Sequence, residues 1–226
     1  MDSMYKILMG LPIFQGVSHA KISELIEKIK FHFLKYTDGE TIVDVDEPCT
    51  NLKFLISGSV RLETLNLNRR IKVLQTLNAP NIIGAEYLFG KRTSYPYSVK
   101  AHPVAGLMQV EKADFLKILK SDIVFLFNTL NYLSRNSQTP TEAVLSLTSG
   151  SVAERVAFWI GSLTYRGSSE IVIESKQKDM YTMLGIQRSA YINTLEELRD
   201  KGVLDFTSGA VYINDRDALL SEMTLG

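Results

Sequence analysis

The stretch Lys176–Lys201, KQKDMYTMLGIQRSAYINTLEELRDK, decides the fold of this chain. Met180, Met183 and Leu184 lie three to four residues apart, and this spacing predicts one apolar face of a short helix. Gly185 comes next, and glycine allows the left-handed backbone that a sharp turn needs. The sequence therefore predicts that the chain reverses direction here after a short helix.

A second helix is predicted after this turn. Its inner face carries Tyr191, Leu195 and Leu198. Its outer face carries Arg188, Ser189, Ile192 and Asn193. Two such helices around a glycine turn are typical of a helix-turn-helix, in which the second helix lies in the major groove of DNA. The same pattern also fits an ordinary helical hairpin, so the neighbouring segments have to decide between the two.

A β-hairpin is predicted immediately after these helices. Val203–Phe206 and Ala210–Ile213 are strand-like runs on either side of Thr207-Ser208-Gly209. A hairpin in this place is typical of the wing of a winged-helix domain, and an ordinary helical hairpin has no reason to be followed by one.

Upstream, Ser151 and Glu154 form a capping-box pattern that predicts the start of another helix.

The N-terminal half reads as a series of short strands with turn signals between them. The predicted strands are 30–36, Thr41–Val45, Leu52–Ser57, Val60–Asn66, Ile71–Leu77, Tyr95–Ala101 and Val104–Val110. Gly58-Ser59 is predicted to form a tight hairpin turn between two of them. Strands at this spacing indicate an antiparallel sandwich or barrel.

Asp122–Leu147 is predicted to be a long helix between these two parts. Apolar side chains recur in steps of three and four, as in a heptad seam that pairs helices of two subunits. The predicted dimer contacts are Ile123, Leu126, Leu130, Leu133, Val144 and Leu147. Pro140 is expected to kink or break the helix because it removes a backbone donor. The alternative is a helix packed on its own domain. The predicted boundaries are 1–121, 122–148 and 149–226.

Composition excludes several classes of protein. Hydrophobic residues make up 45% of the chain, which favours a packed core. Cys49 is the single cysteine, and the histidines His19, His32 and His102 are scattered, so no metal site is expected. No apolar run is long enough for a membrane span, and a lone cysteine fits a reducing cytoplasm. The sequence contains no recognisable nucleophile–base set and no phosphate-binding glycine loop, so an enzyme is not expected.

Charge counts against nucleic acid as a partner. The net charge of the chain is zero, and residues 150–226 contain 8 lysines and arginines against 11 aspartates and glutamates, a net of −3. DNA-binding domains usually show a basic footprint. Contacts to phosphates would therefore have to come from a few well-placed cations and backbone N–H groups.

In this order, the parts resemble the catabolite-activator/FNR (Crp/Fnr) superfamily of bacterial transcription regulators. The resemblance rests on FLISGSVRLE (Phe54–Glu63), AERVAFWI (Ala153–Ile160) and the helix-turn-helix with its wing entry (Asp179–Leu204). It implies an α+β chain with an N-terminal double-stranded β-helix (a jelly-roll, cyclic-nucleotide-binding-like domain), a long dimerisation helix and a C-terminal winged helix-turn-helix. It also implies a homodimer on a palindromic site in double-stranded DNA, with RNA polymerase as a partner.

The resemblance places base-reading residues at the start of the second helix. Arg188 falls at an arginine of the family that reads guanine, whereas Ser189 stands in place of a glutamate and Asn193 in place of a second arginine. Ile192 lies on the same face and is placed to touch a thymine methyl group. Gln187 stands where the family usually has a Ser or Thr cap. The predicted contacts to the DNA backbone are Lys176, Lys178, Ser208 and Gly209.

The predicted effector pocket, Asn81–Ala101, departs from the cyclic-nucleotide-binding members of the family. Gly84 matches, but Ala85 replaces the glutamate that binds ribose, and Tyr95-Pro96 replaces the pair that binds the cyclic phosphate. A cyclic phosphate needs a cation and N–H donors there. We therefore predict that cyclic AMP is not the effector and that the small-molecule effector, if any, is of another kind.

Two questions about the pocket, its ligands and the role of its tyrosines, each allow alternative interpretations. Glu86, Lys91 or Arg92 would supply ligands after a shift of register. The tyrosines Tyr87, Tyr95 and Tyr97 either line a pocket for another molecule or pack a closed core. The alternative function for the whole chain is a ligand-binding or protein-interaction module whose winged helix no longer binds DNA.

Overall fold

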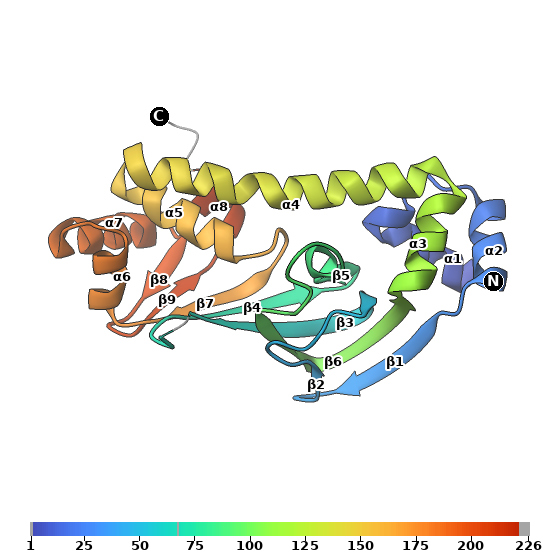
Figure 1. The fold of residues 1–226 in the computed structure, drawn as a ribbon. Helices are drawn as coiled ribbons and strands as arrows, with labels where there is room; N and C mark the ends of the chain where they lie inside the picture. Colours follow the sequence, from blue (N-terminus) through green and yellow to red (C-terminus); the bar gives the residue numbers. More distant parts are fainter. Residues whose placement is uncertain (1, 67, 222–226) are drawn as a thin grey trace. The chain divides into compact units, whose positions relative to one another are not determined.

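The computed structural model describes residues 2–66 and 68–221, with their side chains except those of 2–4, 139–144 and 146–149 (Figure 1). The chain divides into two compact units. The first contains Met1–Val60 and Asn78–Ser137, and the second contains Arg61–Leu77 and Gln138–Gly226. The segment 61–77 therefore packs with the C-terminal part of the chain, although it follows directly on strands of the first unit.

The first unit combines antiparallel strands with helices before, between and after them. Its helices are α1 (Asp2–Gly10), η1 (Pro12–Phe14), α2 (His19–Lys28), η2 (Ala85–Tyr87) and α3 (Lys112–Ser121). Its strands are β1 (His32–Thr37), β2 (Thr41–Val43), β5 (Asn81–Ile83), β6 (Tyr97–Glu111) and the first part of β3 (Asn51–Leu65). Strands β1 and β2 pair with β6, and β5 pairs with β3, all antiparallel. The rings of Phe14, Phe54 and Phe125 meet edge to face in the core.

The predicted hairpin turn at Gly58-Ser59 is wrong. Strand β3 runs unbroken through these residues from Asn51 to Leu65. Gly58 has a positive φ of 71°, and a Cβ there would lie 2.0 Å from the Val104 carbonyl oxygen. The glycine therefore permits a close approach of two backbones within the sheet.

Strand β6 was likewise predicted as two strands, Tyr95–Ala101 and Val104–Val110. It is continuous from Tyr97 to Glu111. The Ser59 hydroxyl donates to the His102 carbonyl, so this part of β6 lies against β3. Both strands therefore continue through positions where the sequence pattern suggests a break.

The long helix α4 (Ile123–Ser149) follows α3 and continues through Pro140. Of the two expected effects of Pro140, a kink or a break, a break is excluded because the helix continues past it. Ile123, Leu126 and Leu130 expose 59%, 36% and 49% of their surface, and Leu133 is half-buried. Val144 and Leu147 lie outside the residues whose side chains are described.

The second unit has the elements of a winged helix. They are α5 (Val152–Leu163), β7 (Ser169–Glu174), α6 (Gln177–Met183), α7 (Arg188–Asp200), β8 (Leu204–Phe206), β9 (Ala210–Ile213) and α8 (Arg216–Ser221). The predicted capping box of α5 is confirmed, because the Ser151 hydroxyl accepts from the Glu154 N–H and the Glu154 carboxylate accepts from the Ser151 N–H. Strand β7 pairs with β9, and β9 pairs with β8.

A strand from the N-terminal half completes this winged-helix sheet. Strand β4 (Lys72–Asn78) pairs antiparallel with β7, with Val73 opposite Ile173 (Figure 1). Ile71 and Val73 are 5% and 2% exposed and belong to the same apolar core as Tyr191 and Leu195. The segment 61–77 thus contributes both backbone pairing and core side chains to the C-terminal unit.

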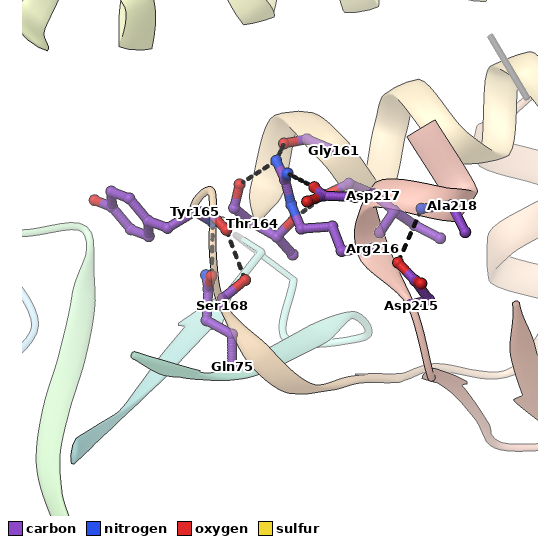
Figure 2. A network of polar contacts seen from close by, with 10 residues as sticks. Gln75, Gly161, Thr164, Tyr165, Ser168, Asp215, Arg216, Asp217 and Ala218 are labelled. Atoms are coloured by element: carbon purple, nitrogen blue, oxygen red, sulfur yellow. Dashed lines mark hydrogen bonds and ion pairs between the residues drawn. The ribbon is translucent and has the colours of Figure 1, made fainter. Parts of the chain in front are cut away.

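Buried polar contacts fix the end of helix α5 in this unit (Figure 2). The Gln75 amide donates to the Leu163 carbonyl at 3.1 Å, and its oxygen accepts from the Tyr165 N–H at 2.7 Å. From the other side, the Arg216 guanidinium donates to the Gly161 carbonyl and to the Thr164 hydroxyl and carbonyl. Both side chains thereby satisfy carbonyls that a helix end leaves without a partner.

We predict that Val73→Ala destabilises the C-terminal unit. The change removes two carbon atoms from a closed core, which costs about 2 kcal/mol of unfolding free energy. Urea unfolding followed by the fluorescence of Trp159, the single tryptophan of the chain, measures it, because Trp159 packs on this core. The control is Val45→Ala, since Val45 is 52% exposed. An unchanged midpoint for Val73→Ala would show that the segment adds nothing to this unit.

Candidate nucleic-acid interface and effector region

The helix-turn-helix has the predicted inner face with one exception. Met180 and Leu184 are buried, and Tyr191, Leu195 and Leu198 of α7 are 2% exposed or less. Met183 is 43% exposed, so its assignment to the apolar face of the first helix is wrong. The turn has Gly185 at a φ of 66°, as its position between the helices requires.

The outer face of α7 is open at its start. Arg188, Ser189 and Asn193 are exposed. Ile192 is half-buried and packs against the apolar core of the unit, so only part of its side chain faces outward. Gln187 occupies the N-cap position without a side-chain hydrogen bond, which leaves N–H groups of the first turn without a cap from that side chain.

The wing meets the start of helix α6. The Ser175 N–H donates to the Gly209 carbonyl at 2.9 Å, and the Gln177 amide donates to the Thr207 carbonyl at 3.3 Å. Ser208 and Gly209 are exposed at the tip of the wing, and Lys176 and Lys178 are exposed beside it. The four predicted backbone-contact residues therefore gather at one edge of the winged helix, around the start of α6.

The region of the predicted effector pocket is packed with tyrosine rings. Tyr95 and Tyr97 are buried, at 0% and 4% exposure, and their ring centroids lie 6.0 Å apart. The ring of Tyr87 lies 6.2 Å from that of Tyr95 and 5.9 Å from that of Tyr97. Gly84 adopts a φ of 65°, and a Cβ on it would lie 2.3 Å from the Tyr95 ring. The Tyr95 ring thus lies directly against the glycine that matches the family pattern.

A buried lysine that sequence reasoning missed holds the Tyr95 hydroxyl. The Lys53 ammonium donates to the Tyr95 oxygen at 3.2 Å and lies 3.9 Å from the Glu47 carboxylate. The Cys49 thiol donates to the same tyrosine oxygen at 3.0 Å. Burial lowers the pKa of Lys53 and raises the pKa of Tyr95 and of the Cys49 thiol. The alternating pattern of the strand gives no sign that Lys53 points inward.

Ala85 and Glu86 belong to the short helix η2 that follows Gly84. Ala85 is buried, and Glu86 is half-buried. Arg92, one of the alternative ligands, is exposed and pairs with Asp46 at 3.5 Å. The structure therefore does not bring Arg92 into the tyrosine cluster.

Helices α3 and α4 share an apolar surface. A hollow is lined by Leu116 and Leu119 of α3 and by Ile123 and Leu126 of α4. Phe127, which the heptad pattern did not include, is 59% exposed. The exposed apolar surface therefore extends beyond the predicted seam.

Two family models match the chain. A model of the cyclic nucleotide-binding domain matches residues 33–122, and a model of the Crp-like helix-turn-helix domain matches residues 154–222. Among curated proteins, the cAMP-activated global transcriptional regulator CRP of Haemophilus influenzae is 20% identical over 178 residues, which are 76% of this chain and 80% of that protein.

Solved structures show the same fold. The catabolite activator protein of Thermus thermophilus is 19% identical, covers 94% of this chain and 98% of its own, and has a TM-score of 0.53. A transcriptional regulator of Thermotoga maritima is 21% identical, covers 56% and 97% of the two chains, and has a TM-score of 0.50. These comparisons confirm the predicted architecture of a jelly-roll domain, a long helix and a winged helix-turn-helix.

We predict that Tyr191 makes the C-terminal unit sensitive to alkaline pH. Burial raises the pKa of Tyr191 from 10.0 to about 12. Between these values the unfolded chain loses the phenolic proton and the folded chain keeps it, so the stability present below pH 10 falls by about 2–3 kcal/mol as the pH rises. Unfolding followed by Trp159 fluorescence at both ends of this range measures the loss.

Two variants isolate this effect. Tyr191→Phe should remove this part of the pH dependence, while Tyr212→Phe should leave it intact because Tyr212 is 42% exposed. An equal alkaline loss in Tyr191→Phe and the unaltered protein would contradict the assignment.

Proposed function

Because the chain belongs to the Crp/Fnr superfamily of bacterial transcription regulators, we propose that it binds a palindromic DNA operator as a homodimer and that it does not respond to cyclic AMP. The family consists of DNA-binding regulators and not of enzymes, in agreement with the expectation from the sequence. The proposed place of action is the cytoplasm, where the chromosome and RNA polymerase are available as partners. Among the described residues, no helix is long and apolar enough to cross a membrane.

The observation that carries the DNA-binding proposal is the two-sided character of helix α7. Tyr191, Leu195 and Leu198 anchor one side in the core, while Arg188 and Asn193 remain exposed on the other. A rigid helix that presents these side chains from its first turns suits the major groove. Arg188 is the proposed reader of guanine, and Asn193 is the proposed reader of adenine. Ser189 and the outward part of Ile192 complete the proposed reading face, beside the uncapped N–H groups after Gln187.

The dimer proposal rests on the exposed apolar stripe of α4. Ile123, Leu126 and Leu130 recur at steps of three and four, and Phe127 widens the stripe. Such a surface is suited to a second copy of the same helix, because an isologous contact buries the stripe on both partners at once. Leu133, Val144 and Leu147 continue the same heptad pattern.

We infer that cyclic AMP is excluded by the tyrosine cluster. The family pattern needs a cation for the cyclic phosphate, and Tyr95 takes that place with its ring against Gly84. The cation Lys53 lies beside this tyrosine, but it is engaged by the Tyr95 hydroxyl and by Glu47. A phosphate that entered this region would lose its hydration without gaining an ion pair to compensate for it. An effector, if one acts here, differs chemically from a cyclic nucleotide.

A random-library DNA selection with the full-length protein tests the main proposal. We predict a palindrome with half-sites about one helical turn apart. We also predict that Arg188→Ala weakens binding to the selected site by roughly 5- to 150-fold, equivalent to about 1–3 kcal/mol for a bidentate base contact. Binding to unrelated DNA should change much less.

Lys201→Ala is the control, since Lys201 is an exposed cation after the far end of the same helix. Equal affinities for Arg188→Ala and the unaltered protein would show that the assigned reading face is wrong. No enrichment of any sequence would favour the protein-interaction module, in line with the net charge of −3 over residues 150–226.

Cyclic AMP should leave the melting temperature of the protein unchanged, even at millimolar concentration. Differential scanning fluorimetry makes the measurement, because a ligand that binds only the folded state raises the melting temperature by mass action. Cyclic GMP serves as a parallel ligand. A concentration-dependent rise with either nucleotide would overturn the exclusion.

A further inference from the structure

Three cations lie in residues 68–72, at the start of β4 and just before it. They are Arg69, Arg70 and Lys72. The Asn66 side-chain oxygen accepts from the Arg70 N–H at 2.9 Å and from the Ile71 N–H at 3.1 Å, which holds the turn in place. Arg69 and Arg70 are exposed. The two arginines therefore project from a turn that is tied to a strand buried in the winged-helix core.

Arg70 lies at the start of helix α6. Its guanidinium is 3.5 Å from the carboxylate of Asp179, which stands in the first turn of that helix. Lys178 precedes Asp179, and the wing tip at Gly209 is bonded to Ser175 just before the helix. The arginine turn thus borders the edge where the proposed contacts to the DNA backbone gather.

The remaining cation of the turn is already engaged. Lys72 lies 3.4 Å from the carboxylates of both Glu63 and Glu174. By contrast, the side chain of Arg70 is 66% exposed in spite of its ion pair with Asp179. Arg69 and Arg70 are consequently the members of the turn that are open to an anionic partner.

The net charge of residues 61–77 is opposite in sign to that of residues 150–226. Residues 61–77 contain Arg61, Arg69, Arg70 and Lys72 against Glu63, a net of +3, whereas residues 150–226 have a net of −3. A DNA-binding domain usually shows a basic footprint, and residues 61–77 carry cations that a count over residues 150–226 leaves out. Packing of 61–77 into the same compact unit brings them to it.

We propose that Arg69 and Arg70 bind backbone phosphates of the operator, as an additional arm of the DNA interface beside α6 and the wing. The inference rests on the proposed DNA-binding function. Exposed arginines suit phosphate oxygens, which accept charge-assisted hydrogen bonds without regard to base sequence. Asp179 holds Arg70 at the interface edge when DNA is absent.

The test measures the affinity of the full-length protein by fluorescence anisotropy between roughly 50 and 200 mM salt. One duplex carries the selected operator, and the other is unrelated. Each phosphate contact contributes about 0.9 to the slope of log affinity against log salt. Arg69→Ala with Arg70→Ala should therefore lower the slope by about 2 and weaken binding by roughly five- to tenfold per arginine, by the same factor for both duplexes.

The matched control is Arg92→Ala. Arg92 is an exposed arginine that pairs with Asp46 at 3.5 Å, so the change removes the same charge and the same kind of ion pair. Its slope and affinity should equal those of the unaltered protein. Arg70→Lys keeps the charge and should restore most of the affinity lost in Arg70→Ala.

Asp179→Asn separates a phosphate contact from a structural role. It breaks the Arg70–Asp179 pair but keeps both arginines, so binding should be as tight as in the unaltered protein or tighter. A loss in Asp179→Asn that matches the loss in Arg70→Ala would overturn the proposal, because the pair would then act only by holding the segment. Unfolding followed by Trp159 fluorescence reports whether any variant has lost its fold.

Two failures are distinguishable. If the unaltered protein binds neither duplex, the proposed function fails and this inference fails with it. If the unaltered protein selects an operator but the double variant keeps its salt slope, only the inference is overturned. The arginine turn would then be a surface for a protein partner.

Discussion

The burial of Ile71 and Val73 beneath the winged helix is the constraint on which the C-terminal unit depends. These side chains reach the core only because β4 pairs with β7, whose other edge is taken by β9. The pairing covers a strand edge that would otherwise be open. Because β3 and β4 are one hairpin, the strand that completes the reading domain continues directly from the jelly-roll strands.

The parts of the chain that were predicted correctly are those fixed by local patterns. The inner face of α7, the capping box at Ser151 and the wing around Ser208 follow from periodicity, caps and turn residues within a few positions. Long-range packing decided the rest. Glycine often marks a turn, but Gly58 instead lets β3 pass close to Val104 of β6. Sequence distance hides that contact.

Two further misses have the same cause. Lys53 lies in a part of β3 where consecutive residues are buried, so the alternation of apolar and polar residues does not indicate where its ammonium points. Its partner Tyr95 is also far away in the sequence. The sequence pattern of residues 61–77 predicts strands of the barrel, and a charge count over residues 150–226 leaves this segment out. Only the pairing of β4 with β7 shows that its arginines belong beside α6. The net charge of −3 over residues 150–226 is correct, but residues 61–77 belong to the same compact unit and carry further cations.

The Lys53–Tyr95 contact also limits what an effector of this region has to do. A buried ammonium is stable only while paired, and here the tyrosine oxygen and Glu47 provide the pairing. An anion that displaces the Tyr95 hydroxyl from Lys53 must supply a hydrogen bond at least as good. Displacement would also move a ring that packs on Gly84, Tyr87 and Tyr97. Binding of such a ligand is therefore coupled by necessity to a rearrangement of the tyrosine cluster.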